Sequence, residues 1–435
     1  MATIQINTNR KVKTMKPMHG GGQPPLRGAG TGDFHYLTEA GIPFSRLHDV
    51  GGAFGAGKFV DIPNVFRNFD ADETDPQNYD FTFTDHLIKA LVEAGVEPYY
   101  RLGTTIENSS LIKAYHIDPP KDPAKWARIC EHIIRHYTEG WANGFHYNIR
   151  YWEIWNEPEV QNQMMWTGTP EEYYNLYDVT AKHLKACFPH LKIGGYASCG
   201  FYAVAPVTGI NPETNLPGTI PPSEHEEKLM RFFYGFFEYI KAHGSPIDFF
   251  SWHSYADVSR VAVMDAWLHE ELAKLGYPGL ETHLNEWDPF PPEYGTAHHS
   301  AEIAAMMIAL QQGNTDICCI YDMRTNTAPY CPLFDIKTHK PIHGYYALAA
   351  FNRLYRLGNQ VEARCDNQRL YALAASNGKQ NALLVANLTG TEQSLAIEGV
   401  DLTDARYYVL DQERLLSWAP HAKTLAPNDV VLVEW

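Results

Sequence analysis

Runs of buried-type residues with polar ends recur along most of the chain. In Tyr151-Trp152-Glu153-Ile154-Trp155-Asn156-Glu157-Pro158, aromatic and β-branched residues predict a buried strand, and Pro158 prevents pairing beyond Glu157. The same pattern of a buried strand with a polar exit recurs at residues 44–49, 96–103, 191–199, 248–255, 281–287 and 316–324. A further short strand near Met18 to Gly20 would bring the set to eight.

Helical periods separate these strands. Apolar residues recur at helical spacing in residues 84–94, 122–139, 169–188, 224–243, 262–275, 297–312 and 345–357. Asp122 before Pro123 indicates a helix start, and Thr169, Pro170 and Glu172 form a capping-box pattern. Because strands and helices alternate, we predict a parallel sheet with right-handed crossovers, closed as a (β/α)8 barrel over residues 15–357.

The helical periods vanish after Gly358. Short strands with turn residues between them predict a small C-terminal antiparallel β-sandwich, with strands at residues 370–375, 382–388, 406–410 and 430–435. The alternation in residues 3–14 suggests an edge strand that joins this sheet. We therefore predict an accessory β-sandwich domain of residues 1–14 plus 358–435. Gly20-Gly21-Gly22 predicts a turn. A phosphate-binding loop is not expected there, because Gln23-Pro24-Pro25 occupies the place where the following helix would have to begin.

Composition narrows the class of partner. The chain has 435 residues, of which 45% are hydrophobic and 20% charged, so it can bury a large core. A formal net charge of -16 argues against nucleic acid or an anionic membrane as partner and favours a neutral ligand. No apolar run is long enough for a transmembrane helix, and the N-terminus lacks a signal-peptide layout. The compartment stays open: secreted or periplasmic if a leader was removed, otherwise cytoplasmic. The oligomeric state also stays open.

The seven cysteines are odd in number and lack paired C-x-x-C spacing, so neither a zinc site nor a disulfide framework is expected. We read them mostly as core residues. His298-His299 lacks the companion residues of a helical zinc motif. No cofactor and no metal are predicted.

Two carboxylates stand at strand exits. Glu157 and Glu286 follow what we count as the fourth and seventh strands. Glycoside hydrolysis needs two carboxyl groups that flank the bond, one as proton donor and the other as nucleophile or base. A Glu at a strand end can also cap a helix or pair with Arg, so spacing alone leaves both readings open. Asn156 adds an amide suited to a sugar hydroxyl, and aromatic rings for sugar faces are offered by Trp155, Trp287 and Phe290.

With these residues in place, the sequence resembles a known group of enzymes. Trp-Asn-Glu-Pro on strand four, His253-x-Tyr255 on strand six and Glu286 followed by an aromatic on strand seven look like clan A of the retaining glycoside hydrolases. Arg46-x-His48 on strand two and the trailing β-sandwich make the chain most similar to glycoside hydrolase family 39, which contains β-xylosidases and α-L-iduronidases.

The resemblance implies a set of roles. Glu157 would be the acid/base, Glu286 the nucleophile and Asn156 the partner of the sugar 2-hydroxyl. Tyr255 would bond the nucleophile, His48 would reach a hydroxyl of the reacting sugar, and Arg46 would lie near Glu286. A carbohydrate substrate, hydrolysis with retention, and carboxyl groups about 5–5.5 Å apart follow. Glu157 should then have a raised pKa, while Glu286 must ionise.

The chain departs from the family at the barrel mouth. On strand three, Arg101 stands where xylosidase-like members carry an acid, and Thr104 where they carry an aromatic. Asp322 at the exit of strand eight is shared with iduronidase-like members. We therefore predict β-xylosidase-like chemistry without naming the sugar, and we count Arg101 and Asp322 among the candidate substrate-binding residues. The alternative is a carbohydrate-binding barrel whose chemistry has lapsed.

Other polar residues have plainer readings. Glu153 lies deep in the predicted barrel, so it should pair with Arg46 or Arg150. Glu159 and Glu293 read as solvated loop residues. His253 fits a site residue and a satisfied core histidine equally well.

Overall fold

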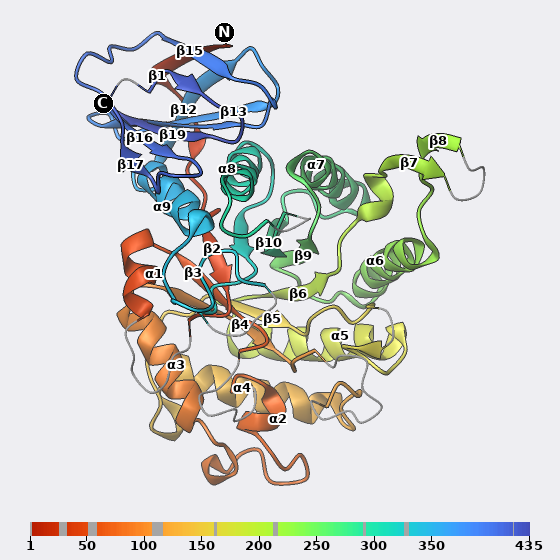
Figure 1. Cartoon of the computed structure of the whole chain (residues 1–435). Coiled ribbons are helices and arrows are strands. Elements are labelled where there is room, and N and C mark those ends of the chain that lie inside the picture. The colour runs from red at the N-terminus through yellow and green to blue at the C-terminus, as the bar shows by residue number, and fades with distance from the viewer. Residues whose placement is uncertain are drawn as a thin grey trace.

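The computed structural model describes residues 2–25, 33–50, 59–106, 116–160, 163–211, 216–289, 293–325, 330–420 and 422–435. These residues form a closed eight-stranded parallel barrel and a separate nine-stranded sheet, which lie at opposite ends of the molecule in Figure 1. The predicted fold class, a (β/α)8 barrel with a small β-sandwich, is confirmed.

The barrel strands follow one another around the barrel in chain order. They are β2 (Gly20–Gly22), β3 (Phe44–Leu47), β4 (Glu97–Leu102), β5 (Tyr151–Ile154), β6 (Lys192–Ser198), β9 (Phe249–Ser254), β10 (Glu281–Trp287) and β11 (Ile317–Ile320). All neighbours pair in parallel, and β11 closes on β2. Since the carboxyl ends of all eight strands lie at one face, side chains from distant parts of the sequence meet there.

Helices connect the strands on the outside of the barrel (Figure 1). They are α1 (Phe34–Ala40), α2 (Ile62–Val65), α3 (Thr82–Glu93), α4 (Pro123–Thr138), α5 (Pro170–Cys187), α6 (Glu224–His243), α7 (Val258–Leu275), α8 (Ala297–Gln312) and α9 (His343–Tyr355), with the 3-10 turns η2 (Pro76–Asn78), η3 (Trp141–Asn143) and η5 (Tyr202–Val204). Two predicted caps are confirmed: Asp122 accepts from the N–H groups of Ala124 and Lys125, and Thr169 forms a complete capping box with Glu172. Helix α7 begins before residue 262, because Asp257 caps it.

The prediction of a turn at Gly20-Gly21-Gly22 was wrong. These residues form β2, the first barrel strand, wedged between β11 and β3. A Cβ on Gly20 would lie 2.7 Å from the carbonyl oxygen of Cys318, and one on Gly21 would lie 2.4 Å from the Met323 side chain. Glycine is required here for close approach of neighbouring strands, so it marks a crowded strand instead of a turn.

The segment 205–222, between β6 and α6, contains a hairpin. Strands β7 (Thr208–Asn211) and β8 (Leu216–Thr219) pair antiparallel, and Figure 1 shows the hairpin projecting from the barrel beyond α6 and α7. Pro217 and the glycines at 209 and 218 obscured its strand pattern.

The second sheet combines the N-terminus with the C-terminal part of the chain. Its strands are β1 (Ala2–Thr14), β12 (Asn359–Cys365), β13 (Leu370–Ser376), β14 (Asn381–Asn387), β15 (Gln393–Glu398), β16 (Arg406–Leu410), β17 (Ser417–Trp418), β18 (Thr424–Leu425) and β19 (Val430–Glu434). The spatial order is β17-β16-β19-β14-β13-β12-β1-β15-β18. The prediction of an edge position for the N-terminal strand was wrong, because β1 pairs antiparallel with β12 and parallel with β15.

One apolar core runs from the barrel into this sheet. Leu373, Leu384 and Leu432 belong to the same buried cluster as residues of α8 and α9, and β13, β14 and β19 contact α8. The other face of the sheet has its own smaller core, which includes Ile4, Val385 and Val431.

The predicted domain boundaries at residues 14 and 357 stay a prediction. Within the described part of the chain, no helix combines the length and apolar character needed to cross a membrane.

Candidate active site

Glu157 projects from a tight turn after the fourth barrel strand. β5 ends at Ile154, and Trp155 and Glu157 then adopt left-handed backbone angles, with φ of 72° and 44°. Such angles cost free energy for residues with side chains and persist where surrounding contacts enforce them. The N–H of Glu157 donates to the carbonyl oxygens of Tyr196 and Ala197 at 3.2 and 3.1 Å, and Trp155 N–H donates to Leu102. Neighbouring strands β6 and β4 thus hold the turn that carries the carboxyl.

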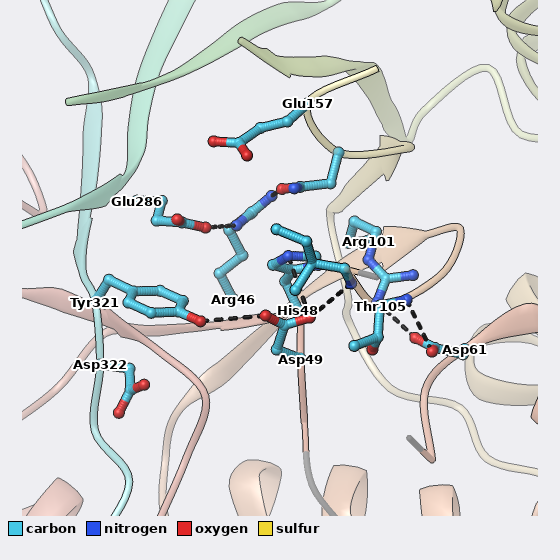
Figure 2. A network of polar contacts seen from close by, with 12 residues as sticks. Arg46, His48, Asp49, Asp61, Arg101, Thr105, Glu157, Glu286, Tyr321 and Asp322 are labelled. Carbon is cyan, nitrogen blue, oxygen red and sulfur yellow. Dashed lines mark hydrogen bonds and ion pairs between the residues drawn. The ribbon is translucent and has the colours of Figure 1, made fainter. Parts of the chain in front are cut away.

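Arg46, from β3, organises the centre of the site. Its buried guanidinium donates from Nε to Glu153 at 2.9 Å and from Nη2 to Asn156 Oδ1 at 2.5 Å. It also donates from Nη1 to Glu286 at 3.1 Å (Figure 2). The predicted structural pairing of Glu153 is confirmed with Arg46, whereas Arg150 pairs with Glu97 at the opposite end of the strands. The neighbouring carboxylates keep the pKa of Arg46 above its ordinary value despite burial.

Glu286, on β10, is held at both oxygens. Oε2 faces Arg46, and Oε1 accepts a hydrogen bond of 2.7 Å from the phenol of Tyr255, which follows β9. Burial raises the pKa of Glu286, partly opposed by His253, Arg46 and the Tyr255 hydrogen bond. The direct ion pair and the phenol both favour the ionised form over the neutral one.

Glu157 has a different environment. His253 Nδ1 lies 2.6 Å from Glu157 Oε1 and 3.8 Å from Glu286 Oε1, so this ring stands between the two carboxyl groups. Burial lowers the pKa of His253 to about 4, which leaves the ring neutral near pH 7. Burial also raises the pKa of Glu157 to about 7. Arg46 contacts Glu286 directly, and this ion pair favours the charged form of that carboxyl group.

The two carboxyl groups lie close together. One oxygen of Glu157, one of Glu286 and a ring nitrogen of His253 all lie within 4.8 Å of one another. Figure 2 shows both carboxyl groups on the same side of the site, next to Arg46. This donor set could chemically ligate a divalent cation, but Arg46 at 3.1 Å from Glu286 opposes a second positive charge there. The other such group in the described residues joins Glu131, His183 and Cys187 on α4 and α5.

His48 and Asp49 form a second polar layer after β3. His48 Nε2 lies 3.4 Å from Asp49 Oδ1, and the Tyr321 phenol donates to Asp49 Oδ2 at 3.2 Å (Figure 2). Asp49 also accepts from the N–H of Ile106 at 3.2 Å, which ties the exits of the second, third and eighth strands together. The sequence signal for Asp49 was its position in the polar exit after Leu47, next to His48.

Three candidate substrate-binding residues are engaged within the protein. Arg101 is fully buried and pairs with Asp61 at 2.6 Å, and Asp61 also accepts from the N–H of Thr105 (Figure 2). Asp322 is fully buried and pairs with Arg324, and burial raises the pKa of Asp322 to about 6. Trp287 is fully buried in the core. Contact of these three with substrate stays a prediction.

Two other sequence readings change. Trp155 is buried, and its ring nitrogen donates to the carbonyl oxygen of Met165, so its ring packs in the core instead of offering a face to a sugar. The reading of Glu159 as a solvated loop residue was wrong, because its side chain is 1% exposed and Oε1 accepts from the N–H of Cys199 at 2.8 Å. Phe290 lies outside the described residues.

Comparison with known proteins identifies relatives of this chain. The family model described as glycosyl hydrolases family 39 matches residues 49–285, more than half of the chain. A β-xylosidase of Caldicellulosiruptor saccharolyticus is 24% identical over 369 residues, which cover 75% of this chain and 66% of that protein. A β-xylosidase of Geobacillus stearothermophilus is 29% identical over 155 residues, or 34% of this chain and 30% of that protein. The matched regions thus span about one third to two thirds of the lengths of these relatives.

Among solved structures, a glucosidase from Croceicoccus marinus superposes with a TM-score of 0.78 at 19% identity. The alignment covers all of this chain and 98% of that one. At this identity the likeness concerns the fold alone.

Proposed function

Because the chain belongs to glycoside hydrolase family 39 and is therefore a glycosidase, we propose that it cleaves its carbohydrate substrate with retention of configuration. The observation that carries this proposal is the close approach of Glu157 and Glu286, whose nearest oxygens lie within 4.8 Å. Retaining enzymes place the carboxyl groups about 5–5.5 Å apart, whereas inverting enzymes need about 6.5–9.5 Å to admit a water molecule.

The proposed reaction has two steps. Glu286, ionised beside Arg46 and Tyr255, attacks the anomeric carbon while Glu157 protonates the departing glycosidic oxygen. Glu157, now a carboxylate, then takes a proton from water, which attacks the anomeric carbon and releases Glu286. His253 holds the Glu157 carboxyl during both steps. The raised pKa of Glu157 supports its role as the acid, which must enter the reaction protonated.

Asn156 is oriented for a sugar hydroxyl. Arg46 donates to its Oδ1, so the amide nitrogen with its two hydrogens is left to donate elsewhere. We assign this NH₂ group to the 2-hydroxyl of the reacting sugar, where such contacts strengthen in the transition state. His48 takes a second hydroxyl in the same subsite.

The proposed activity is β-xylosidase-like hydrolysis of a glycan or oligosaccharide. Its basis is the two curated relatives above, which are named β-xylosidases. A panel of aryl glycosides and oligosaccharides identifies the sugar. A lapsed binding protein is the less supported reading, because both carboxyl groups and the Arg46–Tyr255 support of Glu286 are present.

Covalent trapping tests the mechanism. A 2-deoxy-2-fluoro glycosyl donor of the best sugar should label Glu286, as read by peptide mass spectrometry, and Glu286→Gln should take no label. Glu293→Gln, which alters an exposed carboxylate on the following loop, is the matched control and should be labelled like the wild type. A label on another residue, or an inverted anomeric product by NMR, would refute the assignment.

A further inference from the structure

Three residues of metal-binding type lie together on helices α4 and α5, and the proposed reaction does not use them. Glu131 is on α4, while His183 and Cys187 are one turn apart on α5. His183 Nε2 lies 2.6 Å from Glu131 Oε2 and 3.9 Å from Cys187 Sγ. A carboxylate oxygen, an imidazole nitrogen and a thiol sulfur thus lie within 4.8 Å of one another.

This group is separate from the proposed catalytic centre. Helices α4 and α5 pack side by side on the outside of the barrel (Figure 1). Cys187 is the last residue of α5, and β6 begins at Lys192, so the group lies near the amino ends of the strands. Glu157 and Glu286 lie at the carboxyl ends. A ligand bound between the helices would therefore leave the strand exits open.

The distances suit a zinc ion. Zinc takes a Cys sulfur at about 2.3 Å and a His nitrogen or carboxylate oxygen at about 2.0–2.2 Å, with tetrahedral angles, so its ligand atoms lie about 3.3–3.6 Å from one another. The two distances at His183 Nε2, 2.6 and 3.9 Å, fall on either side of this range. Small side-chain rotations would therefore place all three atoms around one ion. Magnesium and calcium favour oxygen ligands, whereas sulfur and imidazole favour zinc.

Solvent can reach the group. The side chains of Glu131 and His183 are 14% and 30% exposed. An ion can therefore enter from solution, and a water molecule can supply the fourth ligand of a tetrahedral zinc site.

Arg135 supports the carboxylate without blocking it. Its Nε donates to Glu131 Oε1 at 2.7 Å, which leaves Oε2 on the side of His183. Ligating carboxylates are commonly oriented by such an outer hydrogen bond. The charge of Arg135 is balanced by Glu139, which it also contacts. Glu131 and a thiolate at Cys187 would then balance the two charges of zinc.

The ionisation of the ligands is consistent with this geometry. Burial opposes ionisation of Glu131, but hydrogen bonds from Arg135 and His183 outweigh it and lower the pKa of this carboxyl group. Burial and the charge of Glu131 raise the pKa of the Cys187 thiol. A zinc ion would displace the thiol proton, because the thiolate is the form that binds metal.

We propose that Glu131, His183 and Cys187 bind a zinc ion that ties α4 to α5. These helices come directly before and after β5 in the barrel, so the ion would brace both connections of the strand that leads to Glu157. Cysteine spacing could not reveal this group, because Glu131 and His183 are 52 positions apart in the sequence.

Calorimetric titration of the metal-free full chain with Zn²⁺ tests the site. One ion should bind per chain, and Mg²⁺ should not compete. Cys187→Ser and His183→Ala should each weaken binding by at least about 100-fold, since loss of an outer contact to a ligand already costs about 10- to 100-fold. The matched controls are Cys365→Ser, at another half-buried thiol, and His132→Ala, next to Glu131 on α4 but outside the group. Both should bind zinc like the wild type.

Two further readouts use the wild-type protein. At free zinc about 100-fold above Kd, Tm should rise by about 3–5 °C, because the ion binds the folded chain. Zinc should also protect Cys187, but not Cys365, from alkylation by iodoacetamide, as read by peptide mass spectrometry.

The competing zinc site among the described residues is the group of Glu157, His253 and Glu286. Glu286→Gln should therefore keep both the zinc affinity and the protection of Cys187. Unchanged affinity in Cys187→Ser and His183→Ala, or loss of binding in Glu286→Gln, would overturn the proposal. None of these measurements needs turnover, so their outcome is independent of the proposed function.

Discussion

At the scale of single residues, the site depends on an unequal division of charge between two buried acids. Glu286 has an ion pair with Arg46 and a phenol donor in Tyr255, while Glu157 contacts the neutral ring of His253. Each pKa is raised by burial, but only one of the two carboxyl groups has a cation in contact. The ion pair with Arg46 therefore favours the charged form of Glu286, while burial favours the protonated form of Glu157.

Glu157→Ala tests the donor role. Its rate on glycosides with poor leaving groups should fall by about 10²- to 10⁴-fold, the usual contribution of a general acid. Aryl glycosides with good leaving groups need no proton in the first step, so they should lose less, and azide should rescue the second step as a glycosyl azide. Steady-state kinetics and product NMR measure both effects.

The same variant should change the pH profile. Wild-type kcat/KM should decline as pH rises through about 7, because the proton on Glu157 is lost there. For an activated aryl glycoside, Glu157→Ala should lack this decline. Equal losses on both classes of substrate, with the alkaline limb unchanged, would contradict an acid/base role.

Residue identity could predict only part of the site. Glu157 and Glu286 were recognisable because each lies at the exit of a buried strand, and Asn156 and Tyr255 because they lie beside strand exits. Glu159 was misread, since a Glu in a turn is usually solvated. Its burial depends on the exit of β6, whose Cys199 lies 40 positions later.

At the scale of elements, the barrel depends on close strand contacts at small residues. Gly194 of β6 faces β9, and a Cβ there would lie 2.1 Å from the carbonyl oxygen of Phe249. Backbone atoms cannot move aside like the end of a flexible side chain, so this strand pair tolerates only glycine at that position.

Gly194→Ala should therefore destabilise the protein by about 1–3 kcal/mol through overpacking. Gly218→Ala in the projecting hairpin is the matched control, because a Cβ there meets nothing within 4 Å and the change should be near neutral. Urea unfolding followed by fluorescence gives both values. A Gly194→Ala variant as stable as the control would show that β6 can move away from β9.

Elements with local signals were predicted well, and those that depend on neighbours were not. Asp122 and Thr169 indicate the starts of helices α4 and α5, because each caps its helix through contacts within one turn. β2 consists of three glycines, so its sequence shows no alternation of polar and apolar side chains. It forms a strand because it pairs with β11 and β3 on either side. The interior position of β1 depends on β15, nearly 400 residues away.

At the scale of the whole molecule, Gln311 of α8 joins the barrel to the second sheet. It is fully buried, donates to the Thr14 carbonyl oxygen and to Gln360, and accepts from the N–H of Lys16 at 2.6 Å. One side chain thus connects β1, β12 and the segment that enters the barrel.

Gln311→Ala should leave these groups unsatisfied and lower the free energy of unfolding by about 2–3 kcal/mol. Gln312→Ala, at the exposed neighbouring position, is the matched control and should cost less. Calorimetry also tests the division at residues 14 and 357. Because one apolar core spans α8 and β14, we expect a single unfolding transition in the wild type. In Gln311→Ala this transition should occur at a lower temperature. Two separated transitions in the wild type would contradict this coupling.

The sequence by itself determined the alternation of strands and helices, the polar strand exits and the pair of glutamates, because these depend on periodicity and on neighbours within a few residues. Only the tertiary structure decided which residue stands beside each acid. Arg46, Glu153, Asn156 and Glu286 come from three strands that meet around the barrel axis. Charge division and burial depend on distances through space, so Glu157, Glu159 and Glu286 differ in their surroundings although all three are glutamates near strand ends.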